Sequence, residues 1–151
     1  MIYVMKEVQV NHDLADGQTR LTRDQLWRGL VMKAENALPF VPGMVKCEVI
    51  ECTADGLVRD IVFRGEDARE KVSFQPGRKV VFLRLSGNAD GLIVNEILGE
   101  GDADLRLRFS FALQLVDAAS DSAQEQAFRQ VMERDYLKAV QATLEAIRKM
   151  G

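Results

Sequence analysis

Apolar and polar residues alternate most regularly in the stretch from 105 to 115. The apolar series occupies every second position and consists of Leu105, Leu107, Phe109, Phe111, Leu113 and Leu115. Arginine, serine, alanine and glutamine stand between its members. Since successive side chains of a strand point to opposite faces, the stretch is predicted to form a strand with one buried face and one face in water.

Further short runs, rich in β-branched and apolar residues, precede this stretch and are separated by turn residues. They predict strands at 45–51, 57–63, 69–74, 79–85 and 92–98, with breaks at 54–56, 65–67, 75–77, 86–91 and 99–104. A looser alternation over 2–10 indicates one more strand. Together these segments predict an antiparallel sheet of about seven strands.

The region between the first two predicted strands carries the signals of a helix start. Thr22 stands where an N-cap is expected and Gln25 follows three residues later, as in a capping box, with apolar residues at helical spacing behind them. We predict a helix over 23–33. Residues 35–40 are compatible with another helical turn, and Pro39 and Pro42 prevent anything longer.

A second, much longer helix is indicated after residues 120–121. Apolar side chains recur there at intervals of three and four: Phe128, Val131, Met132, Ala139, Val140, Leu144 and Ile147. A helix of about 28 residues is about 40 Å long, and only the apolar face of the sheet is large enough to cover such a stripe. The predicted order of strand, helix, six strands and long helix is typical of the helix-grip arrangement, in the α+β class.

The composition agrees with one folded domain over residues 1–151. The chain is 47% hydrophobic and 28% charged, which is ordinary for a globular protein and argues against disorder. The net charge of −3 gives no basic surface for phosphate backbones or anionic lipid, so we expect no nucleic-acid partner. A chain of this length buries one core.

The sequence also bears on compartment and metal content. Residues 1–7 do not open a signal peptide and no apolar run is long enough for a membrane span, so we expect a cytoplasmic protein without stable membrane association. Cys47 and Cys52 lie around one predicted strand at odd spacing and would point to opposite faces of it, which argues against a disulfide between them. With His12 as the single histidine and no CxxC motif, we expect neither a metal nor a cofactor.

Short motifs in a fixed order resemble a known family. They are LTRDQLWRGL at 21–30, FVPG at 40–43, VRDI at 58–61, AREKV at 68–72, VNEI at 94–97 and LRLRF at 105–109. In order and spacing they resemble a small AtaL-like family of unknown function within the SRPBCC, or START-like, superfamily. The resemblance covers nearly the whole chain.

This resemblance implies a deep cavity between the sheet and the long helix. The superfamily holds lipid and hormone carriers, polyketide aromatase/cyclases and oxygenase subunits, so the fold does not choose among functions. The oxygenase branch requires more histidines than this chain has. The resemblance carries no catalytic motif to this chain, so catalytic residues are unknown at this stage, and His12 is not expected to be catalytic.

Two charged residues fall on predicted inward faces. Glu70 alternates with Val72 and Phe74, and Arg59 shares its face with Leu57 and Ile61. If both face the cavity, the pair would orient a polar ligand group or act as acid and base. The alternative is an ordinary ion pair at the edge or outer face of the sheet.

Asn95 and Glu96 take opposite faces of one predicted strand, so one of them points inward whichever register holds. The pattern does not decide between them. Each of the two residues is a candidate for ligand contact. The competing explanation is a polar side chain that is hydrogen-bonded within the protein or that faces solvent.

Large apolar or amphipathic side chains are predicted to line the cavity: Trp27, Phe40, Phe109, Phe111, Met132 and Tyr136. Packing in the core alone is the competing explanation for them. The charged residues of the long helix have opposite signs four positions apart and are interpreted as a solvated face: Glu125, Arg129, Glu133, Arg134 and Lys138.

Three functions stay open on the sequence. The first is a binding module that holds a small hydrophobic or aromatic molecule. The second is an enzyme of the cyclase, aromatase or hydrolase kind, in which Glu70 or Glu96 transfers protons near Arg59. The third is a structural or interaction domain with a filled cavity, associating through the outer sheet face or an edge strand, for example as a homodimer.

Overall fold

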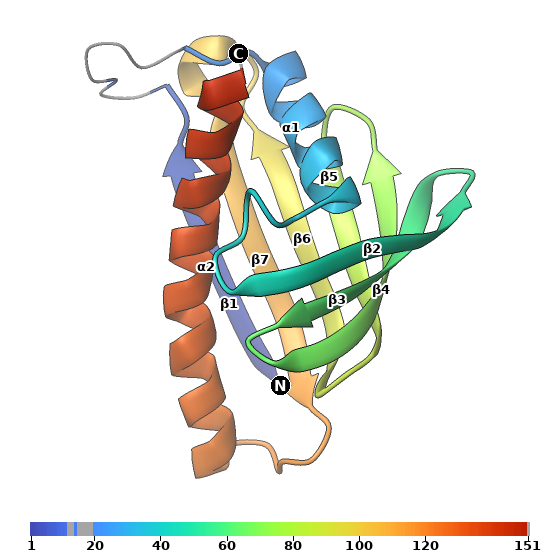
Figure 1. Ribbon diagram of the computed structural model, residues 1–151. Helices are drawn as coiled ribbons and strands as arrows, with labels where there is room; N and C mark the ends of the chain where they lie inside the picture. The colour runs from blue at the N-terminus through green and yellow to red at the C-terminus, as the bar shows by residue number, and fades with distance from the viewer. Residues whose placement is uncertain (12–13, 15–19, 151) are drawn as a thin grey trace.

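A curved antiparallel sheet carries a long helix along one side (Figure 1). The computed structural model describes residues 1–11, 14 and 20–150. In this part of the chain the strands are β1 (Ile2–Gln9), β2 (Met44–Thr53), β3 (Gly56–Phe63), β4 (Glu66–Gln75), β5 (Lys79–Ser86), β6 (Ala89–Leu98) and β7 (Arg106–Leu115). The helices are α1 (Arg23–Glu35), the short 3-10 helix η1 (Asp102–Asp104) and α2 (Ala123–Met150). The predicted helix-grip fold is confirmed.

The order of strands in the sheet is β1-β7-β6-β5-β4-β3-β2. Neighbours in space are therefore neighbours in sequence from β2 to β7, and only the pairing of β1 with β7 joins distant segments. Figure 1 shows α2, in red, running beside β1 and β7, while β2, β3 and β4 curve across the opposite part of the sheet beneath α1. The site described below lies on the concave side of this curve.

The core forms where β7 and α2 meet. Each apolar residue of the alternating series on β7 is buried, and its polar neighbours are partly exposed, as the pattern predicts. From α2 the buried apolar side chains are Met132, Ala139, Val140, Leu144 and Ile147. Full burial of a Leu or Phe side chain stabilises the fold by about 1.5–3 kcal/mol, so this contact fixes the helix on the sheet.

Helix α1 begins with the predicted capping box. The Gln25 backbone N–H donates to Thr22 Oγ1 at 3.2 Å, and the Thr22 backbone N–H donates to Gln25 Oε1 at 2.8 Å. The helix runs to Glu35, and residues 38–40 form a turn. The further helical turn suggested by the sequence does not form, because Pro39 lacks an N–H donor and disfavours helical backbone at Leu38.

Two strands begin earlier than the sequence indicates. Arg64 and Gly65 both have positive φ, of 50° and 81°, as a two-residue type I′ hairpin turn requires. Glu66 therefore belongs to β4 rather than to a longer acidic turn. β6 likewise begins at Ala89, and it contains Gly91 at φ 130°, where a Cβ would overlap the carbonyl oxygen of Ala112.

One charged residue of α2 departs from the predicted solvated face. Glu125 is 2% exposed, because the first turn of α2 packs on the end of β7. Its carboxylate accepts from Gln114 Nε2 at 3.5 Å and from the Asp121 N–H at 3.3 Å. Arg129 and Glu133 form the expected exposed pair four residues apart.

Both cysteines, Cys47 and Cys52, are free, which confirms that no disulfide joins them. Within residues 1–11, 14 and 20–150, no helix combines the length and apolarity that a membrane span requires. His12 lies outside the described residues.

Candidate functional site

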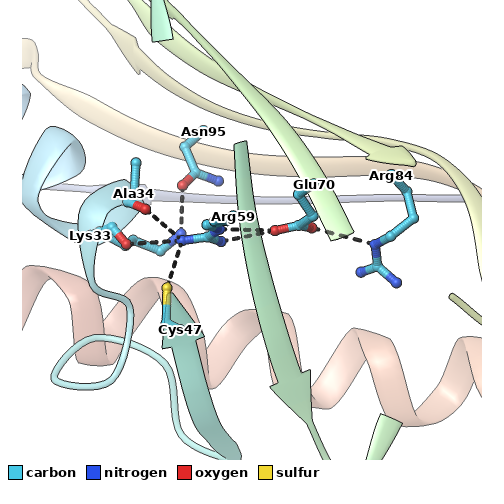
Figure 2. Close-up of polar contacts among 7 residues, drawn as sticks. All are labelled: Lys33, Ala34, Cys47, Arg59, Glu70, Arg84 and Asn95. Atoms are coloured by element: carbon cyan, nitrogen blue, oxygen red, sulfur yellow. Dashed lines mark hydrogen bonds and ion pairs between the residues drawn. The ribbon is translucent and has the colours of Figure 1, made fainter. Parts of the chain in front are cut away.

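A row of charged side chains crosses three strands on the concave face. Arg59 on β3 pairs in register with Glu70 on β4, and Glu70 pairs with Arg84 on β5. The register of β4 and β5 shifts between Arg69 and Glu70, and an irregularity of this kind re-aims side chains. The shift places the Glu70 carboxylate between two arginines (Figure 2).

The Arg59–Glu70 pair is buried. Arg59 is 3% exposed and Glu70 is 1% exposed. Arg59 Nε and Nη2 both donate to Glu70 Oε1, at 3.1 and 3.0 Å, and Arg84 Nε lies 3.4 Å from Glu70 Oε2. The interpretation of these residues as an outer-face ion pair is therefore wrong: the strand alternation turns both side chains inward.

Arg59 also holds the end of helix α1. Its Nη1 donates to the carbonyl oxygens of Lys33 and Ala34, at 3.1 and 3.0 Å, and lies 3.5 Å from Cys47 Sγ. The last carbonyls of a helix have no partner within the helix. All three guanidinium nitrogens of Arg59 therefore donate to the protein, and its main effect is to fix α1 against β3.

Lys33 is a residue of the site that the sequence analysis did not identify. It lies in the last turn of α1 and is 5% exposed. Its Nζ donates to Asn95 Oδ1 at 2.8 Å and sits 4.8 Å from the ring centre of Phe82 and 5.0 Å from that of Phe109. Burial, followed by the positive charge of Arg59, lowers the pKa of Lys33 from 10.5 to about 7, against smaller opposite effects of Glu70 and Cys47.

A lysine in the last helical turn is ordinarily a solvated cation that favours the helix dipole. The available signal was its position: Lys33 follows Leu26 by seven residues and Leu30 by three, on the buried stripe of α1. A lysine within an apolar stripe indicates an inward-pointing amine when the helix covers a cavity.

The structure decides between Asn95 and Glu96. Asn95 is 1% exposed and faces the cavity, whereas the Glu96 carboxylate accepts from Arg108 Nη2 at 2.7 Å on the other face of the sheet. Asn95 Nδ2 and Arg84 Nε are buried donors without a hydrogen-bond partner among the described residues, since Arg84 Nε approaches Glu70 without hydrogen-bond alignment. An unsatisfied buried donor costs about 1–3 kcal/mol, so both are positions where an acceptor oxygen would be stabilised.

These groups surround a cavity of about 70 Å³. Its walls contain six of the residues predicted to contact a ligand: Arg59, Glu70, Asn95, Phe109, Met132 and Tyr136. Lys33 and Arg84 join them from α1 and β5. The cavity thus has a charged wall, built from β3, β4, β5 and α1, and an apolar wall to which α2 contributes.

Three predicted aromatic residues lie behind the cavity wall instead. Trp27 packs edge-on against Phe74 with ring centres 6.1 Å apart. Phe40 is buried in the core, and Phe111 packs edge-on against Tyr136 with ring centres 4.4 Å apart. Like Glu96, they are absent from the cavity lining, because each finds a packing partner in the core.

Tyr136 brings a hydroxyl into the cavity. Burial is the main cause that raises the pKa of its phenol, and Arg84 partly opposes this effect. The hydroxyl therefore stays protonated at neutral pH and is able to donate a hydrogen bond.

A larger apolar groove adjoins the cavity. It has a volume of about 310 Å³ and shares four lining residues with the cavity: Ile61, Phe63, Arg84 and Met132. Phe128 and Val131 of α2 add to its apolar wall. Arg64, in the β3–β4 turn, also lines the groove and bonds Asp135 of α2 at 2.6 Å, so an ion pair links the hairpin to the helix beside the groove.

Solved structures share this architecture at low sequence identity. An aromatase/cyclase, ZhuI, from Streptomyces superposes with a TM-score of 0.79 at 17% identity, covering 99% of this chain and 96% of that one. A protein from Thermus thermophilus gives 0.76 at 13% identity, covering 97% of each chain. A START superfamily protein from Mycobacterium smegmatis gives 0.72 at 10% identity, covering 99% of each. At these identities the likeness shows the fold alone.

No curated protein matches the sequence significantly. A family model does: the one described as Acetylaranotin biosynthesis cluster protein L, or AtaL, matches residues 8–151. The match spans the capping box of α1, the paired strands of the charged row and all of α2. The chain therefore belongs to the AtaL family.

Proposed function

We propose that the protein binds a small molecule with an apolar or aromatic body and an oxygen-bearing head group. The observation that carries the proposal is the pair of unsatisfied donors, on Asn95 and Arg84, at the charged wall of an otherwise apolar cavity. An oxygen with lone pairs, in a carbonyl, carboxylate, enolate or phenolate group, would satisfy them.

The charge of the wall supports the same head group. Three basic side chains, Lys33, Arg59 and Arg84, face the single carboxylate of Glu70. The charges of Arg59 and Glu70 compensate each other, because the two groups lie 3.0 Å apart. The wall therefore carries a net positive charge, from Arg84 and from Lys33 when its amine is protonated. A negative or electron-rich oxygen would be attracted there, and more strongly than in water because the wall is buried.

The dimensions divide the ligand into two parts. Pockets for drug-sized ligands measure about 300–1,000 Å³, so the cavity of about 70 Å³ admits a head group only. The adjoining groove of about 310 Å³ would take the apolar body against Phe128 and Val131. The shared residue Arg84 would lie where the two parts join.

The comparisons agree with a small organic ligand. The family model carries the name of a biosynthesis cluster protein, and one of the similar folds is an aromatase/cyclase. Both names refer to proteins concerned with small organic molecules. They support the class of ligand without identifying it.

Two measurements test the proposal. Native mass spectrometry with organic extraction, on protein purified without added ligand, is expected to show a small apolar molecule with an oxygen head group.

Calorimetric titration with benzoate, the simplest aromatic molecule with such a head, should give saturable binding that weakens about tenfold or more in Asn95→Leu. Glu96→Gln, on the same strand and the other face, is the matched control and should bind as the wild type does. Equal binding by Asn95→Leu would refute the proposed orientation.

A cyclase-like enzyme is the second candidate, favoured by the buried amine of Lys33 and the neutral hydroxyl of Tyr136, two residues that line the same cavity. The carboxylate version weighed from the sequence finds less support: Glu96 lies off the cavity, and both Glu70 oxygens face arginines. A base with a pKa near the working pH is the most effective, and Lys33 has such a pKa, about 7. Deuterium exchange into the methyl group of acetophenone, followed by NMR, should be faster with wild type than with Lys33→Met. Equal rates would exclude this activity.

A further inference from the structure

We propose that Lys33 is a carbonyl-reactive amine whose Nζ forms a reversible imine with an aldehyde or ketone bound in the cavity. The inference rests on the proposed function, because it takes a carbonyl as the oxygen-bearing head group. It goes beyond the proposed function because it assigns a covalent step, imine formation, to Lys33 Nζ. The substrates would be small aromatic or apolar aldehydes and ketones.

The surroundings of Nζ carry the proposal. Its hydrogen-bond partner among the described residues is the neutral amide oxygen of Asn95, at 2.8 Å, and no carboxylate there lies within ion-pair distance of it. The flat faces of Phe82 and Phe109 flank it at 4.8 and 5.0 Å. The positive charge of Arg59 acts on the amine, and Figure 2 shows Glu70 on the side of the Arg59 guanidinium away from Lys33.

This arrangement favours the neutral amine over the ammonium form. Burial removes the water that would stabilise the charge, and Arg59 repels it, while Arg59 itself takes up the nearest carboxylate. With a pKa of about 7, about half of Lys33 is neutral at pH 7, against about 0.03% of an ordinary lysine. Only the neutral amine has the lone pair that attacks a carbonyl carbon.

The step balances without any further reactant. The Nζ lone pair forms a bond to the carbonyl carbon, the carbon–oxygen π electrons move to oxygen, and a proton passes from nitrogen to oxygen to give a carbinolamine. The nitrogen then forms its second bond to carbon as the hydroxyl leaves, and the remaining N–H proton departs with it as water. Asn95 Nδ2, which has no hydrogen-bond partner within residues 1–11, 14 and 20–150, belongs to the amide that binds the amine and is positioned to donate to the oxygen before it leaves.

The other lysines provide an internal reference. Lys71 on β4 and Lys138 on α2 are exposed to solvent, whereas Lys33 is buried. A carbonyl reagent at neutral pH should therefore distinguish Lys33 from them by reactivity, whereas a simple difference in access would favour the exposed residues.

The experiment uses benzaldehyde and cyanoborohydride at about pH 7 on the intact protein. Hydride adds to the imine carbon and a proton to nitrogen, which leaves a stable benzyl group on the lysine. Intact mass and peptide mapping should show one benzyl group, on Lys33, formed at least about tenfold faster than on Lys138. The rate of labelling at Lys33 should rise as the pH increases through the Lys33 pKa of about 7. Benzoate should suppress the labelling.

Variants separate chemistry from folding. Lys33→Met should lose the fast labelling and Lys138→Met should keep it. Ala139→Leu, which narrows the cavity while leaving Lys33 in place, should slow labelling at Lys33 to the rate of the exposed lysines. This second variant keeps the test decisive if Lys33→Met folds poorly.

The outcomes for the imine and for the binding proposal are distinct. Labelling of Lys33 no faster than Lys138 overturns the imine, whatever the benzoate result. If benzoate binds in the same preparation with the Asn95 dependence given above, the binding function stands without the covalent step. If benzoate does not bind and Lys33 is still labelled selectively, the imine stands and the oxygen-anion preference is wrong.

Discussion

Lys33 is the charged side chain of the cavity with the least stabilisation from opposite charge. Its hydrogen-bond partner Asn95 is neutral, and its neighbour Arg59 is positive. Arg59 and Glu70 were identifiable from the sequence, since a period of two puts both on inward faces. The same reasoning left Asn95 and Glu96 undecided, because register depends on partner strands that the pattern does not show. The burial of Lys33 was not predicted, because a charged residue near a helix end usually faces water.

The buried amine should make stability depend on pH. The unfolded chain holds a proton on Lys33 up to a pKa of 10.5, whereas the folded chain releases it at about 7. Between these values the unfolded state binds more protons, so the free energy of unfolding rises with pH. We expect Lys33→Met to be more stable than wild type at neutral pH and below, and this excess to shrink by about 2–3 kcal/mol between pH 7 and 9.

Urea denaturation of both proteins across this range measures the difference. Lys138→Met replaces an exposed lysine of α2 and should track the wild type at each pH. An excess stability of Lys33→Met that does not change with pH would contradict the buried, partly neutral amine.

The pH dependence of ligand binding should run the opposite way. Benzoate is attracted by the protonated amine, so its affinity is expected to fall as pH rises through about 7, where Lys33 loses its charge. Titration calorimetry at several pH values measures this. Affinity that is flat from about pH 6 to about pH 8 would show that the Lys33 charge does not contact the ligand.

At the scale of elements, two arginine–carboxylate pairs join the same two strands in different surroundings. Arg59 and Glu70 are buried, with side chains 4% and 2% exposed, whereas Arg69 and Asp60 are 50% and 29% exposed. Removing one member of a buried pair leaves a charge without a partner and costs about 3–5 kcal/mol. Exposed pairs contribute about 0–1 kcal/mol.

We therefore expect Arg59→Met to lower the free energy of unfolding by about 3 kcal/mol or more and to loosen the end of α1, whose carbonyls it binds. Arg69→Met, the matched control on the neighbouring strand, should lose about 1 kcal/mol or less. Chemical denaturation measures both, and amide exchange near Ala34 reports the helix end. Equal losses would mean that burial of the first pair has no energetic consequence.

The contact between α1 and α2 depends on a residue without a side chain. A Cβ on Gly29 would overlap the buried side chain of Ile147. Alanine raises helix propensity by about 1 kcal/mol, yet we expect Gly29→Ala to be destabilising because overpacking costs about 1–3 kcal/mol. In the double variant Gly29→Ala/Ile147→Ala the loss should be smaller than the sum of the single losses. Additive losses in thermal or urea unfolding would count against this packing.

Most elements could be predicted because their signals are local. Thr22 and Gln25 mark the start of α1 within four residues, and the β7 alternation needs no partner to be recognised. The start of β4 could not be predicted, because Glu66 resembles a turn residue until the backbone of Arg64 and Gly65 is known. Glu125 was misjudged for a related reason: its burial follows from how α2 docks, which is a long-range property.

At the scale of the whole molecule, the curved sheet and α2 enclose a small charged cavity that adjoins a larger apolar groove. The amphipathic length of α2 predicted that the helix lies on the sheet, and the family resemblance implied the cavity between them. The sequence could not give the volume of about 70 Å³, which depends on how side chains from eight helices and strands pack. The structural or interaction role and the homodimer both stay predictions, and light scattering after size exclusion tests the homodimer.

The ion pair between Arg64 and Asp135 connects the β3–β4 hairpin to α2 beside the groove. Its removal in Arg64→Ala should let the hairpin move away from the helix and speed the exchange of a bound molecule more than it changes affinity. Stopped-flow measurement of ligand dissociation tests this, with Arg129→Ala as a control on the exposed face of α2. A dissociation rate equal to that of the wild type would show that the Arg64–Asp135 ion pair does not control ligand exchange.

The central claim is that the cavity holds an oxygen-bearing head group against Lys33 and Asn95, and an NMR titration of ¹⁵N-labelled protein with benzoate tests it most directly. The account predicts saturable shifts of the Asn95 side-chain amide and of backbone amides around Lys33 and Arg84, all lost in Ala139→Leu. Signals on the outer face, around Glu96 and Arg108, should stay in place. Shifts confined to that outer face, or none that saturate, would contradict it.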